Sequence, residues 1–301
     1  MHGLKWTPAG KQLQNGQHIK RRLGIHLRTG GGLLAAARHA HEIGCTTFQI
    51  MSGNPSAWNP GRLDPVKAAE FAAYTREHDL PVFLHAGYLI NLSCRRGPNT
   101  LIHARSVKLL QASIDRAQAL GCEQVVFHPG SRRGVSAGES LAALLDGIGS
   151  MEAGGVVLLL ENGAGSGDTA CSRFEELGQV LNAAAGRGLA APLGVCLDTA
   201  HLWGAGYDLT SAAAARRLVD EFDRVVGIGR LKLIHLNDSP LERGSRRDRH
   251  EHLGCGQISP AALTALARHP RLREVPLIME TPGASSPSDG QRMRDLRELA
   301  G

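Results

Sequence analysis

Short apolar segments recur along the chain from Leu23 onward, and each is followed by a polar or glycine-rich stretch. Their aliphatic and β-branched residues predict strands at 24–27, 46–51, 82–85, 124–128, 156–161, 193–198, 231–235 and 275–280. The segment 156–160 is apolar at every position, which is typical of a strand buried on both faces of a parallel sheet.

The longer segments between these strands carry apolar residues three and four positions apart, as helices do. One such segment places them at Val107, Leu110, Ile114 and Ala117. Gly44 and Gly121 stand where helices would end. Eight strands alternating with eight helical segments over about 280 residues predict a single (β/α)8 TIM barrel, an α/β fold. A doubly wound open sheet is the alternative.

The amino-acid composition limits the classes of protein to which the chain can belong. The chain has 301 residues, of which 42% are hydrophobic, so a sizeable core is expected. No stretch approaches the ~20 apolar residues that cross a bilayer. We predict that residues 1–22 form a flexible basic N-terminal extension with no secretory signal. Residues 23–301 are predicted to form the barrel, which would be the catalytic domain. We expect a cytoplasmic monomer that binds no membrane.

Charge and cysteine content add two points. The formal net charge of +6 fits a polyanionic partner. The six cysteines form no Cys-x-x-Cys pair, which argues against a zinc ribbon or a redox motif.

The predicted strands end in residue types that bind metal ions. In a parallel barrel the carboxyl ends of all strands meet at one face, where the chemistry is carried. Nine histidines and acidic residues occupy these ends or the loops that follow: His85, His128, Glu161, Asp198, His201, His235, Asp248, His250 and Glu280.

Any one of these residues alone is more often a hydrogen-bonding or helix-capping residue than a ligand. Four carboxylates gathered without cations would raise one another's pKa values, and divalent cations remove that conflict. Nitrogen and oxygen ligands suit Zn²⁺, and also Mn²⁺ or Fe²⁺. At about three or four ligands per ion, nine residues predict two or three ions. Three such ions beside four carboxylates leave a net charge of about +2, which suits phosphoryl transfer.

The same loops are basic and partly aromatic. Eight arginines follow the third, fourth and seventh strands: Arg95, Arg96, Arg132, Arg133, Arg243, Arg246, Arg247 and Arg249. Their shared side of the barrel fits a nucleic-acid backbone. Trp58, Tyr88, Trp203 and Tyr207 are candidates for stacking on bases, with core packing as the alternative for each tryptophan.

Five sequence blocks resemble the endonuclease IV family of apurinic/apyrimidinic (AP) endonucleases in order and spacing. They are HAGYLINL at 85–92, VFHPGS at 126–131, GVCLDTAHLWGAGYDL at 194–209, HLNDSPLERGSRRDRHEHLG at 235–254 and PLIMETPG at 276–283. The Glu-Asn pair at 161–162 matches too, and the resemblance covers roughly 23–300. It implies a xylose-isomerase-like TIM barrel with three zinc ions, with Mn²⁺ as an alternative at one position.

The resemblance also assigns the nine residues to ions. One ion would be held by His85, His128 and Glu161. A second would be held by Glu161, Asp198, His235 and Glu280, and a third by His201, Asp248 and His250.

The implied activity is DNA repair. The family cuts duplex DNA hydrolytically on the 5′ side of an abasic site, leaving a 3′-hydroxyl and a 5′-deoxyribose phosphate, and trims blocked 3′ ends. Its mechanism implies a metal-bound hydroxide, held near the catalytic residues Glu161 and Glu280, that attacks phosphorus in line. An abasic nucleotide lacks stacking, so it leaves the duplex at less cost than a normal one.

DNA contacts are expected from Tyr88, Arg246, Arg247 and Arg249. Ser56, in the segment 53–58, stands where the family has a DNA-inserting arginine, and Cys255 replaces a common glutamate. His252 has no assigned ligand role.

Two other functions compete with this one. A metal-dependent sugar isomerase or epimerase would use a related barrel with one or two ions, but it needs neither the Asp-Arg-His block at 248–250 nor an arginine rim. A non-enzymatic DNA-binding module would have no use for nine convergent ligands.

Overall fold

The described part of the chain is a closed barrel of eight parallel strands, each paired with its sequence neighbours and β8 with β1. The structure is a computed structural model that describes residues 21–283 and 288–301. The strands are β1 (Leu23–Leu27), β2 (Phe48–Met51), β3 (Val82–His85), β4 (Gln124–Phe127), β5 (Val157–Glu161), β6 (Leu193–Asp198), β7 (Leu231–His235) and β8 (Leu277–Met279). The predicted TIM barrel is therefore confirmed, and the open sheet is excluded.

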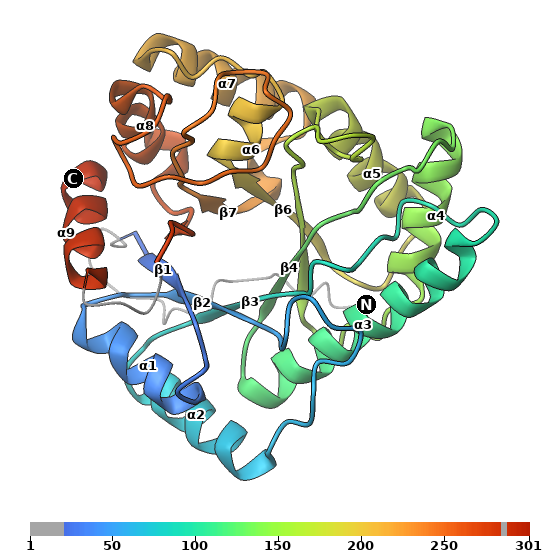
Figure 1. The fold of residues 1–301 in the computed structure, drawn as a ribbon, viewed down its shortest axis with the longest axis horizontal. Helices are drawn as coiled ribbons and strands as arrows, with labels where there is room; N and C mark the ends of the chain where they lie inside the picture. Colours follow the sequence, from blue (N-terminus) through green and yellow to red (C-terminus); the bar gives the residue numbers. More distant parts are fainter. Residues whose placement is uncertain (1–20, 284–287) are drawn as a thin grey trace, which may run out of the picture.

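Helices surround this barrel and cover its outer face (Figure 1). They are α1 (Leu33–Glu42), α2 (Pro65–Glu77), α3 (Asn99–Leu120), α4 (Ala137–Gly149), α5 (Phe174–Gly186), α6 (Thr199–Gly204), α7 (Ala212–Val225), α8 (Pro260–Ala267) and α9 (Asp289–Ala300), with 3-10 turns Ile228–Arg230 and Pro270–Leu272. Gly44 and Gly121 take positive φ angles where α1 and α3 end, as predicted.

Strand alternation divides the core into two layers. One face of each strand points into the barrel, where an apolar cluster fills its interior: Phe83, Val126, Val157, Leu159, Cys196, Leu233 and Ile278. The intervening residues, such as Leu158 and Leu160 of β5, pack outward in the larger layer beneath the helices. Because side chains fill the barrel interior, chemistry is confined to the ends of the strands.

The structure departs from the predicted elements in detail. The last strand is Leu277–Met279 rather than 275–280, since Val275 closes the preceding 3-10 turn by donating to the Leu272 carbonyl. An additional short helix, α6, directly follows β6 and carries His201.

The predicted N-terminal extension lies outside the described residues except for Arg21 and Arg22. The Arg21 guanidinium donates to the carbonyls of Ala267 and Leu272, and that of Arg22 pairs with Asp79 at 2.8 Å. No helix in the two described ranges is long and apolar enough to cross a membrane.

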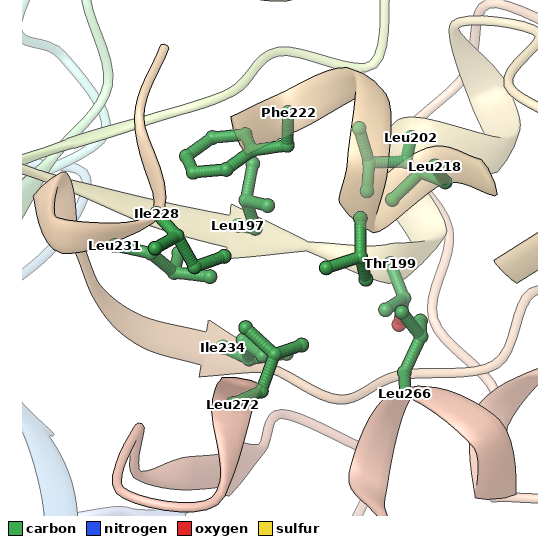
Figure 2. Close-up of a pocket in the computed structure, with 11 residues that line it drawn as sticks. Leu197, Thr199, Leu202, Leu218, Phe222, Ile228, Leu231, Ile234, Leu266 and Leu272 are labelled. Atoms are coloured by element: carbon green, nitrogen blue, oxygen red, sulfur yellow. The ribbon is translucent and has the colours of Figure 1, made fainter. Parts of the chain in front are cut away.

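A small apolar cavity lies between β6, β7, α7 and α8 (Figure 2). Leu197, Phe222, Ile234 and Leu266 line it, and its volume is about 10 Å³. A volume of that size is at the lower limit for one water molecule, and a water needs polar partners. The cavity is therefore a packing gap rather than a ligand site.

Candidate metal centre

The residues predicted as ligands come together at the carboxyl end of the barrel. His85, Glu161, Asp198 and His235 are the last residues of β3, β5, β6 and β7. His128 directly follows β4, and Glu280 directly follows β8. Glu161, Asp198 and His235 are fully buried. These six side chains are spread over 196 positions of the sequence, from His85 to Glu280. The closed barrel brings them together at its carboxyl end, which we call the mouth of the barrel.

Glu161 lies at the centre of this arrangement. Its Oε2 atom lies 3.1 Å from His85 Nε2 and 3.6 Å from His128 Nε2. Its Oε1 atom lies 3.1 Å from His235 Nδ1, which is itself 3.2 Å from Glu280 Oε2. Ligand atoms of His85, His128 and Glu161 lie within 4.8 Å of one another, and so do those of Glu161, Asp198, His235 and Glu280. One carboxylate therefore belongs to two ligand groups.

A third group is built from α6 and the long loop after β7. His201 Nε2 lies 3.2 Å from Asp248 Oδ2, and His250 Nε2 lies 3.3 Å from Asp248 Oδ1. His250 Nε2 also lies 3.4 Å from Asp198 Oδ2, and Asp198, His201 and His250 form a group within 4.8 Å. Asp198 thus faces two groups, which the sequence does not reveal. Its other oxygen caps α6 by accepting from the His201 backbone N–H at 2.8 Å.

Hydrogen bonds to carbonyl oxygens orient four of the histidines. The bonds join His85 Nδ1 to Ala86 O at 2.7 Å, His201 Nδ1 to Asn162 O at 3.0 Å, His250 Nδ1 to Glu280 O at 3.1 Å and His235 Nε2 to Gln49 Oε1 at 2.9 Å. A carbonyl oxygen only accepts, so each of these nitrogens carries the proton. The other nitrogen of each ring then points at the carboxylates, as in metal-binding histidines.

Two buried atoms test whether the residues fit metal ions. Nε2 of His201 and Nε2 of His250 are buried and have no hydrogen-bond partner among the described residues. Each nevertheless lies within 3.4 Å of a carboxylate oxygen. A buried polar atom without a partner is costly, and a divalent cation between the nitrogen and the oxygen would satisfy both. The donor set, imidazole nitrogen with carboxylate oxygen, fits such an ion.

The pKa values of these side chains agree with a site for cations. Burial lowers the pKa of His201, but Asp198 and Asp248 outweigh it and raise that pKa well above its usual value. Burial likewise raises the pKa of Glu161, but His128 and His235 hold it well below its usual range. Burial opposes ionisation of Asp248 too, but the nearby imidazoles of His201 and His250 bring its pKa to about 2. Protons on the histidines balance carboxylates that cations would otherwise balance, so metal binding must release protons.

Three polar residues missed in the sequence support the ligands. Gln49 Nε2 donates to Glu280 Oε1 at 2.6 Å, and Asn237 Nδ2 donates to Asp198 Oδ2 at 2.6 Å. His26 Nδ1 lies 3.1 Å from Glu280 Oε1. Gln49, which is buried, and His26, which is partly buried, each interrupt an apolar strand with a polar side chain, and that interruption is the signal that could have identified them.

Cys196 lies beneath the centre, close to Glu161 and His235. Burial raises the pKa of its thiol to about 12. Ligand atoms of Cys196, Glu161 and His235 lie within 4.8 Å of one another, so these residues form a further group that could hold a metal ion.

The aromatic candidates separate into two kinds. Trp203 is 5% exposed and packs in the core, so the core-packing alternative holds for it. Tyr207 is 8% exposed and packs in the core as well, so its ring is not placed to stack on a base. Trp58 is partly buried, with the Arg105 guanidinium 5.9 Å from its ring centroid. Tyr88 is 59% exposed, and its ring lies 5.8 Å from that of His85. Tyr88 is thus the aromatic side chain exposed beside the centre.

Several of the eight arginines are held by other groups. Arg132 pairs with Asp168 and Glu176, while Arg95 and Arg243 pair with Asp146 and Asp208. Arg246 donates to the carbonyls of Gly165 and Gly167 at 2.7 and 2.8 Å, which ties the loop after β7 to the loop after β5.

Arg247 and Arg249 are exposed on the same loop, and Arg249 Nη1 donates to the Asp248 carbonyl at 3.0 Å. Ser56 is exposed in a loop whose Pro55 carbonyl accepts from the Tyr88 N–H at 2.9 Å. Ser56 therefore lies on the Tyr88 side of the mouth, and Cys255 is exposed as well.

Comparisons with known proteins point in one direction. The xylose isomerase-like TIM barrel family matches residues 37–300. The probable endonuclease 4 of Solibacter usitatus (strain Ellin6076) is 38% identical over 286 residues, which cover 93% of this chain and 97% of that relative. The probable endonuclease 4 of Cenarchaeum symbiosum (strain A) is 35% identical over 93% of this chain and 99% of its own length.

Solved structures agree. Endonuclease IV from Thermus thermophilus superimposes with a TM-score of 0.79 at 35% identity, over 92% of this chain and 98% of that one. A D-tagatose 3-epimerase-like protein has a TM-score of 0.69 at 17% identity, which shows a shared fold alone. The chain therefore belongs to the endonuclease IV family of xylose isomerase-like TIM barrels.

Proposed function

We propose that the chain is a DNA-repair AP endonuclease of the endonuclease IV type. It hydrolyses the phosphodiester 5′ to abasic sites in duplex DNA, leaving a 3′-hydroxyl and a 5′-deoxyribose phosphate, and trims blocked 3′ ends. The observation that carries the proposal is the convergence of nine ligand-type side chains in three overlapping groups at one mouth. Relatives named endonuclease 4, at 33–38% identity over most of the chain, support it.

The proposed ligands are those in the groups described above. His85, His128 and Glu161 would hold one ion, Glu161, Asp198, His235 and Glu280 a second, and His201, Asp248 and His250 a third. Zinc fits this donor set, with Mn²⁺ as an alternative at one position. When bound, the ions supply Lewis-acid activation of a water molecule and neutralise charge on the phosphate.

The chain's own residues set the geometry for this chemistry. Glu161 is held between His85 and His235, so its carboxylate is fixed before substrate arrives. Glu280 accepts from Gln49 at its side chain and donates its backbone N–H to Asn237 Oδ1 at 2.7 Å. Such fixed carboxylates orient an attacking water without reorganising during the reaction.

Substrate recognition follows from the exposed groups around the centre. Arg247 and Arg249 supply positive charge for the DNA backbone, with Arg246 beside them. Tyr88 offers an exposed ring for the space left by the missing base. Partial burial and nearby carboxylates raise the pKa of Tyr88 to about 12, so its hydroxyl remains a donor.

The test is incision of a duplex that carries one tetrahydrofuran abasic analogue. Zinc-loaded protein is expected to nick it on the 5′ side, and a duplex with an intact base is expected to stay whole. Metal analysis of the same preparation is expected to give about three ions per chain. Absence of incision, together with epimerisation of ketohexoses and about one ion per chain, would favour a sugar epimerase instead.

A further inference from the structure

His26 lies at the edge of the metal centre without belonging to any of its ligand groups. It is on β1, and its side chain is 13% exposed. It lines an open pocket of about 480 Å³ together with Arg28, Tyr88, His250 and Glu280. A pocket of this size suits a small-molecule fragment or a nucleotide.

The neighbours of His26 determine which ring nitrogen carries its proton. The Gln49 amide nitrogen lies 2.8 Å from His26 Nδ1 and 2.6 Å from Glu280 Oε1. An amide NH₂ has two hydrogens, so it donates one to each of these atoms. The reverse orientation of the amide would place its oxygen 2.6 Å from a carboxylate oxygen, where both atoms only accept. Glu280 Oε1 also lies near His26 Nδ1, but at 3.1 Å it is farther away than the Gln49 amide nitrogen. A proton on Nδ1 would face the amide hydrogens of Gln49 at that shorter distance, so Nδ1 accepts from Gln49 and the proton is on Nε2.

Nε2 of His26 is available to the pocket. No described residue makes a hydrogen bond to it, and it is not among the buried polar atoms without a partner. Gln49 and Glu280 occupy the Nδ1 edge of the ring, so its solvent-exposed part faces the cavity. Arg28, two positions further along the chain, also lines this pocket and adds positive charge. A neutral donor beside a cation is a surface that recognises an anionic oxygen.

We propose that His26 is a substrate-binding residue whose Nε2–H donates to a nonbridging oxygen of the substrate phosphate, while Gln49 holds the ring through Nδ1. The inference rests on the proposed function, because it assumes a phosphate bound over the centre. It assigns His26 no metal and no proton transfer. Its part is to hold the phosphate on the Glu280 side of the mouth.

Paired substitutions separate the two ring nitrogens. Asparagine places its amide near the Nδ1 position, and glutamine places its amide near the Nε2 position. His26→Asn is expected to lower kcat/KM on the tetrahydrofuran duplex about 10- to 100-fold, and His26→Gln is expected to stay within a few-fold of wild type. Calorimetric titration of zinc-loaded protein with inorganic phosphate is expected to show the same order. His78→Asn, an exposed histidine at the end of α2, is the matched control and is expected to change neither.

Zinc content and thermal unfolding of each variant complete the experiment. Equal zinc with weaker phosphate binding in His26→Asn alone supports the contact. The proposal is overturned if His26→Asn cuts and binds phosphate normally, if both variants lose zinc in parallel with activity, or if His26→Gln is as weak as His26→Asn. Wild-type protein that binds phosphate but does not incise would contradict the proposed function and leave the His26 contact standing on the binding data.

Discussion

The candidate metal centre has two halves that the fold supports differently. In the first, which we call the strand half, the proposed ligands His85, His128, Glu161, His235 and Glu280 end strands or directly follow them. In the second, the loop half, His201 lies on α6, while Asp248 and His250 lie on a loop without regular structure between β7 and α8. Glu161 is fully buried, whereas the Asp248 side chain is 54% exposed. Asp198 faces both halves.

The two halves keep their side chains in position by different interactions. Strand ends are held by the barrel's ladder of hydrogen bonds, so the strand half needs little beyond the fold itself. The loop half depends on separate anchors. Gly244 N and Arg246 N donate to carbonyls of α6 at 2.9 and 3.0 Å, and Trp203 Nε1 donates back to Leu241 O at 2.8 Å. Figure 1 shows this loop, drawn in orange, beside α6 and α8.

The buried carboxylate of Asp238 holds the two ends of the same loop together. Asp238 accepts from the backbone N–H groups of Ser239, Gly254, Gly256 and Ile258 at 2.7 to 3.1 Å. An added Cβ at Gly256 would lie 2.4 Å from the Asp238 carboxylate, so only glycine permits this approach. The loop half is therefore built from backbone anchors rather than from strand register.

The largest effect is expected in the strand half from Glu161→Gln. The amide keeps the size of the side chain but removes the charge shared by two ligand groups. Incision is expected to fall on the order of 10³-fold. Metal analysis is expected to show loss of about two ions, since each group keeps fewer charged ligands. An unchanged circular dichroism spectrum would show that the fold remains, and near-normal turnover would remove Glu161 from the mechanism.

Asp248→Asn is the matching change in the loop half. Its carboxylate lies between His201 and His250, so the variant is expected to lose about one ion and keep the others. Incision is expected to fall on the order of 10²-fold. Parallel loss of all the ions in a zinc titration would show that the halves are not independent, contrary to the comparison above.

Asp238→Asn tests the hydrogen bonds that hold the ends of the loop together, and Asp238 is not one of the proposed metal ligands. Its amide nitrogen would face backbone N–H donors, and the free energy of unfolding is expected to fall by about 2 kcal/mol. Zinc binding is expected to weaken at one position only, with incision reduced about 10-fold. Asp146→Asn, an exposed aspartate paired with Arg95, is the control in urea unfolding and is expected to stay within about 0.5 kcal/mol. Equal weakening at every metal position would contradict a role confined to the loop.

The smallest effects are expected from the arginines of the loop. Arg249→Ala is expected to lower the slope of log affinity against log salt by about 1 and to leave unfolding unchanged. Arg246→Ala is expected to add a loss of stability of about 1 kcal/mol, because its guanidinium ties two glycine carbonyls of the neighbouring loop. Filter binding over a range of salt concentrations, with urea unfolding alongside, distinguishes the two. Identical salt slopes and free energies of unfolding in the two variants would show that the hydrogen bonds from Arg246 to the neighbouring loop do not stabilise the protein.

Much of this architecture is local in the sequence. Apolar runs such as 156–160 predict buried strands because continuous hydrophobicity suits a sheet covered on both faces. Strand ends then define one face of a parallel barrel, so the positions of His85, Glu161 and Glu280 already predict convergence. Residue type alone favours zinc-like ions, since imidazole and carboxylate without thiolate select hard or borderline metals.

Other features depend on tertiary structure alone. The sharing of Asp198 between the two halves depends on where the loop after β7 folds back, which no periodicity encodes. Gln49 and His26 acquire their roles only when β1 and β2 lie beside Glu280. Trp203 and Tyr207 are candidates for base stacking from the sequence, but side-chain packing in the folded chain buries them. The sequence by itself determined which residues stand at the ends of strands, and so at one end of the barrel, because each strand is encoded by a local apolar run. The fold decided which of these side chains touch, because contact brings together segments that are far apart in the sequence.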